Sequence, residues 1–265
     1  YTDLPFLVKI KEENGRYVAE RLIRASDLKN DLSKVKNSSW KPVLPDEISG
    51  SFVIPNGTIG SRWDESRKWN LELKNALNGE AIQPALSVLK SHDEVIEISF
   101  PYFGGDTYKH EHFSASQHDD IINRKVPVKK SSDGDFLYCT VFDLMVANYG
   151  ISRGFDDKYT AADFGEDLPY TPAWQEQITG VPAMQVISTA RQFAENAAKT
   201  RGKSMIIIGA GVNHWFHTDM IYRSAINMLM FCGCVGQSGG GWAHYVGQEK
   251  VRPQTGWLPL AFALD

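Results

Sequence analysis

A short apolar run that ends in two closely spaced glycines constrains the fold of this 265-residue chain most strongly. The run covers residues 204–208, and Gly209, Gly211 and an amphipathic helical pattern follow it. A continuous apolar strand is typical of a parallel sheet covered on both faces. Glycines at a strand-to-helix turn let backbone N–H groups approach a phosphate, and a helix N-terminus favours its negative charge. The stretch therefore predicts a ligand site lined by main chain.

Two helical patterns come before this strand. Thr171 has the position of an N-cap with Pro172 after it, that helix ends at Gly180, and a second helix with a clear apolar face runs from Pro182 to Arg201. The order helix, helix, strand, helix and glycine turn predicts an α/β fold. We expect a partial Rossmann-like parallel sheet covered by helices in residues 166–265.

The pattern of residues 1–165 differs from that of the C-terminal part and predicts an irregular α+β region. Their strand patterns alternate between apolar and polar residues, a polar tryptophan-bearing stretch at 30–80 separates them, and a helix is expected after the last strand. The predicted elements are strands at 4–10, 16–23, 94–100 and 135–141 and a helix at 142–149.

Composition excludes several classes of protein. The net charge of −4 gives no basic surface for nucleic acid. Three cysteines do not form a secreted disulfide scaffold. The longest apolar run, residues 225–235, has about half of the roughly 20 residues that a membrane span needs. Both ends of the chain read like cuts through a longer polypeptide.

A second glycine turn, Gly239-Gly240-Gly241, comes directly before Trp242 and His244. Ordered glycines lose more backbone entropy than other residues, so three in a row indicate close approach of another group, although a flexible loop is the alternative. We expect the two glycine turns, on either side of one helix, to enclose a single phosphate-bearing ligand.

The first turn differs from the dinucleotide fingerprint of nicotinamide enzymes. His214 replaces the third glycine, and the acidic residue expected about 20 positions later is absent. A nicotinamide-dependent dehydrogenase is therefore disfavoured, and a tight turn that merely needs glycine remains an alternative. His214 and His217 could join Cys232 and Cys234 at zinc, but cysteines in an apolar helical pattern are more often core residues. A polar loop with further histidines is more simply a solvated surface, and its histidines are His110, His112 and His118.

Residues 239–250, read as GGGWAHYVGQEK and continued to Trp257, resemble a particular family. The helix pair at 170–182 and the segments 62–72 and 100–106 carry the same resemblance. The chain resembles the molybdopterin oxidoreductases of the dimethyl-sulfoxide-reductase type, and among them the alpha subunits of membrane-bound respiratory nitrate reductases.

That resemblance implies a catalytic subunit that reduces nitrate to nitrite at molybdenum, held by two molybdopterin guanine dinucleotides. Electrons would come from quinol through an iron–sulfur beta subunit and a haem-b gamma subunit, at the cytoplasmic face of a prokaryotic membrane. This chain would contribute contacts to the cofactor. The implied cofactor-binding residues are Gly209, Gly211, Asn213, His214, Gly239, Gly240, Gly241, Trp242 and His244.

The family's His/Cys set for a [4Fe–4S] cluster and its molybdenum-ligating Asp have no counterpart in this sequence. We therefore expect an internal fragment with no catalytic or metal-ligating residue of its own and no nitrate reductase activity alone. A platform for subunit interaction in residues 1–165, without direct cofactor contact, is the alternative function.

Overall fold

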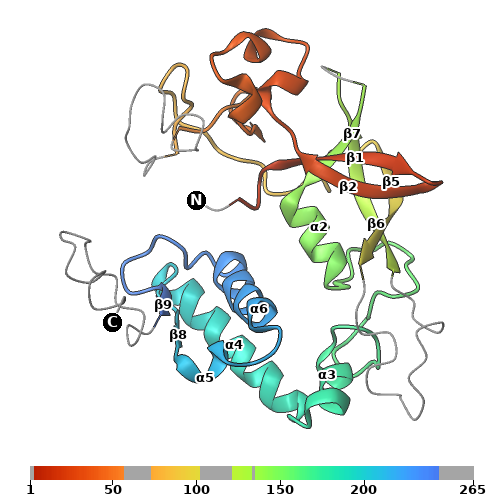
Figure 1. The fold of residues 1–265 in the computed structure, drawn as a ribbon, viewed down its shortest axis with the longest axis vertical. Helices are drawn as coiled ribbons and strands as arrows, with labels where there is room; N and C mark the ends of the chain where they lie inside the picture. Colours follow the sequence, from red (N-terminus) through yellow and green to blue (C-terminus); the bar gives the residue numbers. More distant parts are fainter. Residues whose placement is uncertain (1–2, 57–72, 102–120, 133–134, 245–265) are drawn as a thin grey trace, which may run out of the picture. The chain divides into compact units, whose positions relative to one another are not determined.

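The computed structural model describes residues 3–56, 73–101, 121–132 and 135–244. It divides the chain into two compact units, Tyr1–Ala190 and Arg191–Asp265, with the boundary inside helix α4 (Ala183–Thr200) (Figure 1). Strands and helices occur in both units, which confirms the α/β class. The functional regions that we predicted, 1–165 and 166–265, are a division of another kind and stay a prediction.

The first unit contains a closed five-stranded barrel in the order β1-β2-β5-β6-β7. Neighbouring strands are antiparallel except β2 and β5, which are parallel at Tyr17 and Ile98, and β7 pairs back with β1. Asn14 and Gly15 both have positive φ, as a two-residue hairpin turn requires. The strands are β1 (Leu7–Glu13), β2 (Arg16–Leu22), β5 (Glu94–Pro101), β6 (Ile121–Lys130) and β7 (Leu137–Thr140).

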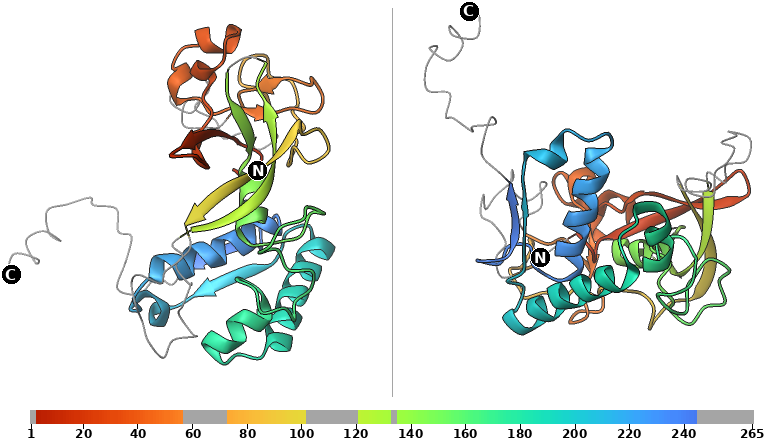
Figure 2. Two further views of the ribbon diagram at one scale, coloured as in Figure 1. Left: turned by 90° about the vertical axis from the view of Figure 1, so that its right-hand side faces the viewer. Right: turned by 90° about the horizontal axis from the view of Figure 1, so that it is seen from below.

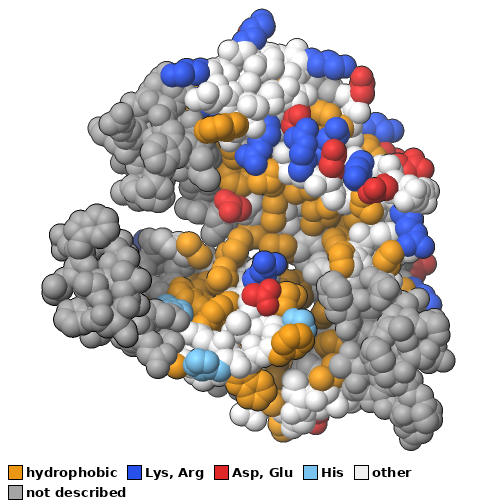
Figure 3. Space-filling model, viewed as in Figure 1, with side chains coloured by type: hydrophobic (Ala, Val, Ile, Leu, Met, Phe, Trp, Pro, Cys, Tyr) orange, Lys and Arg blue, Asp and Glu red, His pale blue; other side chains and the backbone are white. Residues whose placement is uncertain are grey.

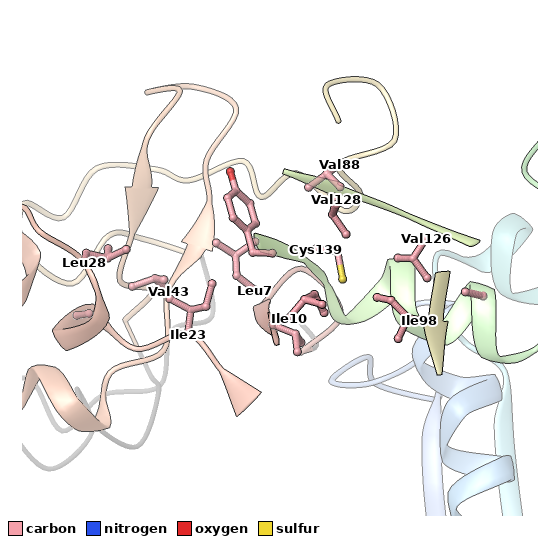
Figure 4. Packing of buried hydrophobic residues seen from close by; sticks show 14 of the residues in the cluster. Leu7, Ile10, Ile23, Leu28, Val43, Val88, Ile98, Val126, Val128 and Cys139 are labelled. Atoms are coloured by element: carbon pink, nitrogen blue, oxygen red, sulfur yellow. The ribbon is translucent and has the colours of Figure 1, made fainter. Parts of the chain in front are cut away.

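Strand residues and loop residues share the core of this unit (Figure 4). Ile98 and Val126 from the barrel are fully buried, and so are Ile23 and Val43 from the segments after β2. The loops therefore extend the core beyond the barrel. The short elements around it are η1 (Ala25–Asp27), η2 (Asp31–Lys34), η3 (Ser38–Trp40), β3 (Leu44–Pro45) and β4 (Phe52–Val53).

The buried carboxylate of Asp143 connects helix α2 (Val141–Asn148) to two loops by hydrogen bonds and an ion pair. Asp143 forms a capping box with Thr140 at the start of the helix. Its oxygens also accept hydrogen bonds from the Ser87 hydroxyl at 2.5 Å and the Val88 N–H at 3.0 Å, and they lie 2.7 Å from Arg153 Nη1. The charge of Asp143 is fully buried and is compensated by this set of donors.

The predicted helix pair is confirmed. In α3 (Pro172–Thr179), the Thr171 side chain accepts from the Trp174 N–H at 3.1 Å, and Gly180 ends the helix with a φ of 72°. This is the expected combination of N-cap, early proline and left-handed C-cap.

The second unit pairs β8 (Met205–Ile208) with β9 (Gly241–His244) in parallel. The chain between them forms α5 (Ala210–Asn213) and α6 (Thr218–Phe231). Helices α4 and α6 lie on the same side of the strand pair (Figure 2). Their small core consists of Ala197, Leu229 and Cys234 with Phe193, Ile206, Cys232 and Trp242 around it.

We expected helices to cover both faces of the parallel sheet, but in the described residues only one face of the β8–β9 pair is covered. Ile208 on the packed face is buried, whereas Met205 and Ile207 on the other face are 43% and 78% exposed. A parallel strand pair of this kind normally belongs to a larger, fully covered sheet.

Candidate functional site

The carboxyl edge of the β8–β9 pair brings together residues from two distant parts of the sequence. Ile208, the last residue of β8, is in register with His244, the last residue of β9. Gly209 follows β8 directly, so it lies beside His244. Ligands of open α/β sheets bind outside this edge of the strands. The part of the predicted site formed by Gly209, Gly211, Asn213, His214 and His244 therefore lies at one edge.

The single helix that we predicted after Gly211 is interrupted. Helix α5 ends at Asn213 with His214 as its C-cap, and α6 starts only at Thr218, after His217 in a left-handed conformation with a φ of 59°. The Thr218 hydroxyl donates to the carbonyl of Val212 at 2.7 Å and closes the break. His214 and His217 thus flank the break and do not share a helix face, and both are exposed.

Neither a left-handed backbone nor a close neighbour in the described chain requires glycine at Gly209 or Gly211, although Gly209 is the N-cap of α5, a position that also suits glycine. Neither has a positive φ, and a Cβ added to either would meet no atom within 4 Å. Every other described glycine has a positive φ or a close neighbour at that position. The main chain at these two residues is therefore open to the approach of another group, and their role in binding stays a prediction.

The second glycine turn has an internal explanation. A Cβ on Gly240 would clash with the carbonyl oxygen of Gly202, and the Gly241 N–H donates to the carbonyl of Ser204 at 3.1 Å. Gly241 pairs with Met205, the first residue of β8. The turn therefore packs against the start of the strand pair.

We expected the two glycine turns to enclose a single ligand, but the structure does not bring them together. Gly209 and Gly241 lie at opposite ends of the strand pair, which is about 10 Å long from its three residue steps. Binding by Gly239, Gly240 and Gly241 stays a prediction.

Tyr222 of α6 is a residue that our reading of the sequence missed. Its hydroxyl lies 3.3 Å from Nε2 of His244, and its ring meets the Trp242 ring edge-on, with centroids 5.3 Å apart. Trp242 is half-buried in the core of the unit. The sequence pattern could have indicated this residue. Tyr222 is seven residues before the buried Leu229 and so lies on the same face of the helix.

The cysteines near the site are parts of the core. Cys234 is fully buried against Leu229, as the apolar pattern predicted. Burial, and after it the neighbouring Cys234, raises the pKa of the half-buried Cys232 thiol. Within the described ranges, no group of three His, Cys, Asp or Glu side chains is placed to hold a metal ion. His110, His112 and His118 lie outside those ranges.

Histidine and hydrophobic side chains are neighbours on the face of the second unit seen in Figure 3. On the barrel strands of the first unit, the same view shows Lys and Arg mixed with Asp and Glu.

The family model of the molybdopterin oxidoreductases matches residues 24–261 of this chain. The chain belongs to the molybdopterin oxidoreductase family. Membership in this family implies a molybdopterin cofactor. It does not favour the alternative that the chain is a nicotinamide-dependent dehydrogenase. The match includes both strands of the second unit and the loop at their carboxyl edge.

Among molybdopterin oxidoreductases, the chain is similar to alpha chains of nitrate reductases. It is 55% identical over its whole length to the respiratory nitrate reductase 1 alpha chain of Escherichia coli and covers 21% of that protein. It is 47% identical over its whole length to the nitrate reductase alpha chain of Bacillus subtilis and covers 20% of it. A shorter match, 39% identity over 35% of the chain, is to the perchlorate reductase subunit alpha of Dechloromonas aromatica, of which it covers 9%. The chain spans about a fifth of the length of the nitrate reductase alpha chains.

Proposed function

We propose that this chain is part of the alpha subunit of a molybdenum-dependent respiratory nitrate reductase and that the carboxyl edge of β8–β9 contacts its cofactor. The main chain at Gly209 and Gly211 carries the second part of the proposal, because no atom of the described chain lies within 4 Å of the position that a Cβ would take at either residue, which leaves room for a ligand. The whole-length identity to nitrate reductase alpha chains supports the first part.

The residues of this edge fit a phosphate-bearing pterin. Gly209 and Gly211 let the ligand reach backbone N–H groups, and Asn213, His214 and His244 provide amide and imidazole donors. Asp219 in the first turn of α6 disfavours an anion at that helix end, so the glycine main chain and the imidazoles carry the contact. The cofactor form that we propose is the bis-molybdopterin guanine dinucleotide.

When bound, the cofactor supplies the molybdenum at which nitrate loses an oxygen atom to give nitrite and water, with two electrons and two protons consumed. The residues of this chain bind and orient the cofactor and exclude water from it. We propose that electrons arrive from quinol through an iron–sulfur beta subunit and a haem-b gamma subunit, and through a [4Fe–4S] cluster held elsewhere in the alpha subunit.

We propose that this complex lies at the cytoplasmic face of the membrane. Among the helices of the described ranges, none is both long and apolar enough for a membrane span.

Substitution of Gly209 tests the cofactor contact. In the full-length alpha subunit expressed with its partners, Gly209→Val should lower the molybdenum and pterin content and reduce nitrite formation in proportion, without loss of folded protein. Ala198→Val, at an exposed position of α4, is the control and should retain full cofactor content. Full cofactor content in Gly209→Val would refute the contact.

A further inference from the structure

The ring of Tyr222 is held between two residues of β9 that point to the same side. Its centroid lies 5.3 Å from that of Trp242 with planes 84° apart, and 6.0 Å from that of His244 with planes 69° apart. Edge-to-face contacts of this kind are favourable and directional. Trp242 packs in the core with Ile206. Its contact with the Tyr222 ring therefore connects that ring to the core of the second unit.

The Tyr222 hydroxyl extends from this anchored ring to the end of the strand. It lies 3.3 Å from Nε2 of His244, whose side chain is exposed at the carboxyl edge. His244 is in register with Ile208, directly before the unobstructed main chain of Gly209. The hydrogen bond therefore controls an imidazole that lies beside the candidate cofactor contact.

The chemistry of the pair gives this bond a consequence. A neutral imidazole has one donor and one acceptor nitrogen, and the partner of one nitrogen decides which tautomer is present. A phenolic hydroxyl can donate or accept, but it is a stronger donor than acceptor, so it favours the tautomer in which it donates to Nε2 and the proton is on Nδ1. The ring then has one fixed donor and one fixed plane.

We propose that Tyr222 is a positioning residue for the cofactor site: it holds His244 in the Nδ1–H tautomer so that the imidazole donates to a phosphate oxygen of the cofactor. This inference rests on the proposed function, because it needs a phosphate-bearing cofactor at this edge. Tyr222 itself does not touch the ligand. It acts through His244, and a ring without the hydroxyl would fill the same space without fixing the tautomer.

The test compares Tyr222→Phe, His244→Ala and the double variant in the full-length alpha subunit with its partners. The readout is the rate at which pterin is released under mild heating, followed by the fluorescence of the oxidised pterin. Loss of one hydrogen bond should make release roughly three- to tenfold faster in Tyr222→Phe. Because Tyr222 acts through His244, the double variant should release pterin no faster than His244→Ala alone.

A purely structural tyrosine would behave differently. Its removal would either leave the release rate unchanged or add its effect to that of His244→Ala, and either result overturns the inference. Tyr159→Phe removes an exposed hydroxyl that lies 3.1 Å from Lys158 Nζ in the first unit, and it should leave the rate unchanged. If His244→Ala and Gly209→Val both keep their pterin at the wild-type rate, the proposed site itself is wrong. If those two lose it faster and Tyr222→Phe does not, only the role of Tyr222 is wrong.

Discussion

Replacement of Asp143 by asparagine should destabilise the first unit more than any surface change. The carboxylate accepts from Ser87, Val88 and Thr140 and pairs with Arg153, whose side chain is only 9% exposed. In asparagine an NH2 group, which is a donor, replaces one of the two acceptor oxygens. That NH2 group must face either the Arg153 guanidinium or a backbone N–H, and both of these are donors too. Loss of one partner of a buried ion pair costs about 3–5 kcal/mol, since the other charge stays buried.

Hydrogen–deuterium exchange measures this cost within the intact alpha subunit. Each 1.4 kcal/mol is a factor of ten, so amides in residues 137–148 should exchange about two to four orders of magnitude faster in Asp143→Asn. Asp31→Asn is the matched control, because its pair with Lys34 at 2.8 Å is exposed to solvent, which screens it, so its loss should leave the exchange rates unchanged. Exchange in Asp143→Asn within threefold of the wild type would refute the reasoning, and so would an equal effect of Asp31→Asn.

Two further outcomes follow from groups in the first unit. Burial raises the pKa of Asp46, but hydrogen bonds from the Ser49 hydroxyl and from the N–H groups of Gln83, Ser49 and Ile48 outweigh it and hold that pKa below its usual value. The stabilisation by Asp46 is thus complete above the unfolded pKa of about 3.9 and is lost as the pH falls through the folded pKa. The protection factor of amides near Gln83, which compares the exchange rate of an unstructured peptide with theirs at the same pH, should therefore fall on acidification in the wild type and depend less on pH in Asp46→Asn. Burial, and then Asp143, raises the pKa of the Cys139 thiol well above its ordinary value, so mass spectrometry should find it unalkylated by iodoacetamide until the unit unfolds. Alkylation of Cys139 in the folded subunit at the rate of the unfolded one would contradict this.

The sequence was most informative where local signals agree with each other. The helix at 172–179 has an N-cap, an early proline and a terminal glycine, and each signal acts within a few residues. The hairpin of β1 and β2 likewise has its turn residues, Asn14 and Gly15, between two alternating strands. Such elements are predictable because their causes lie within the element.

The closure of the barrel was not predictable in the same way. Strand β6 was missed, and its register with β5 joins residues such as Glu94 and Val128 that are far apart in the sequence. The burial of Arg124 in the same strand also hid the strand pattern, since a charged residue at an inward position reads as surface. Long-range pairing depends on which strands meet, and no local pattern carries that information.

The two glycine turns show the same limit for the site. Both look like ligand turns in the sequence, but backbone packing against Gly202 explains Gly240, whereas no contact in the described chain explains Gly209 or Gly211. A glycine whose main chain is open on the side where a Cβ would lie is the better candidate for a ligand contact, because the fold itself does not fill that space. By this criterion the carboxyl edge of β8–β9, with His244 and Tyr222 beside it, is the part of the chain where the cofactor contact should be sought first.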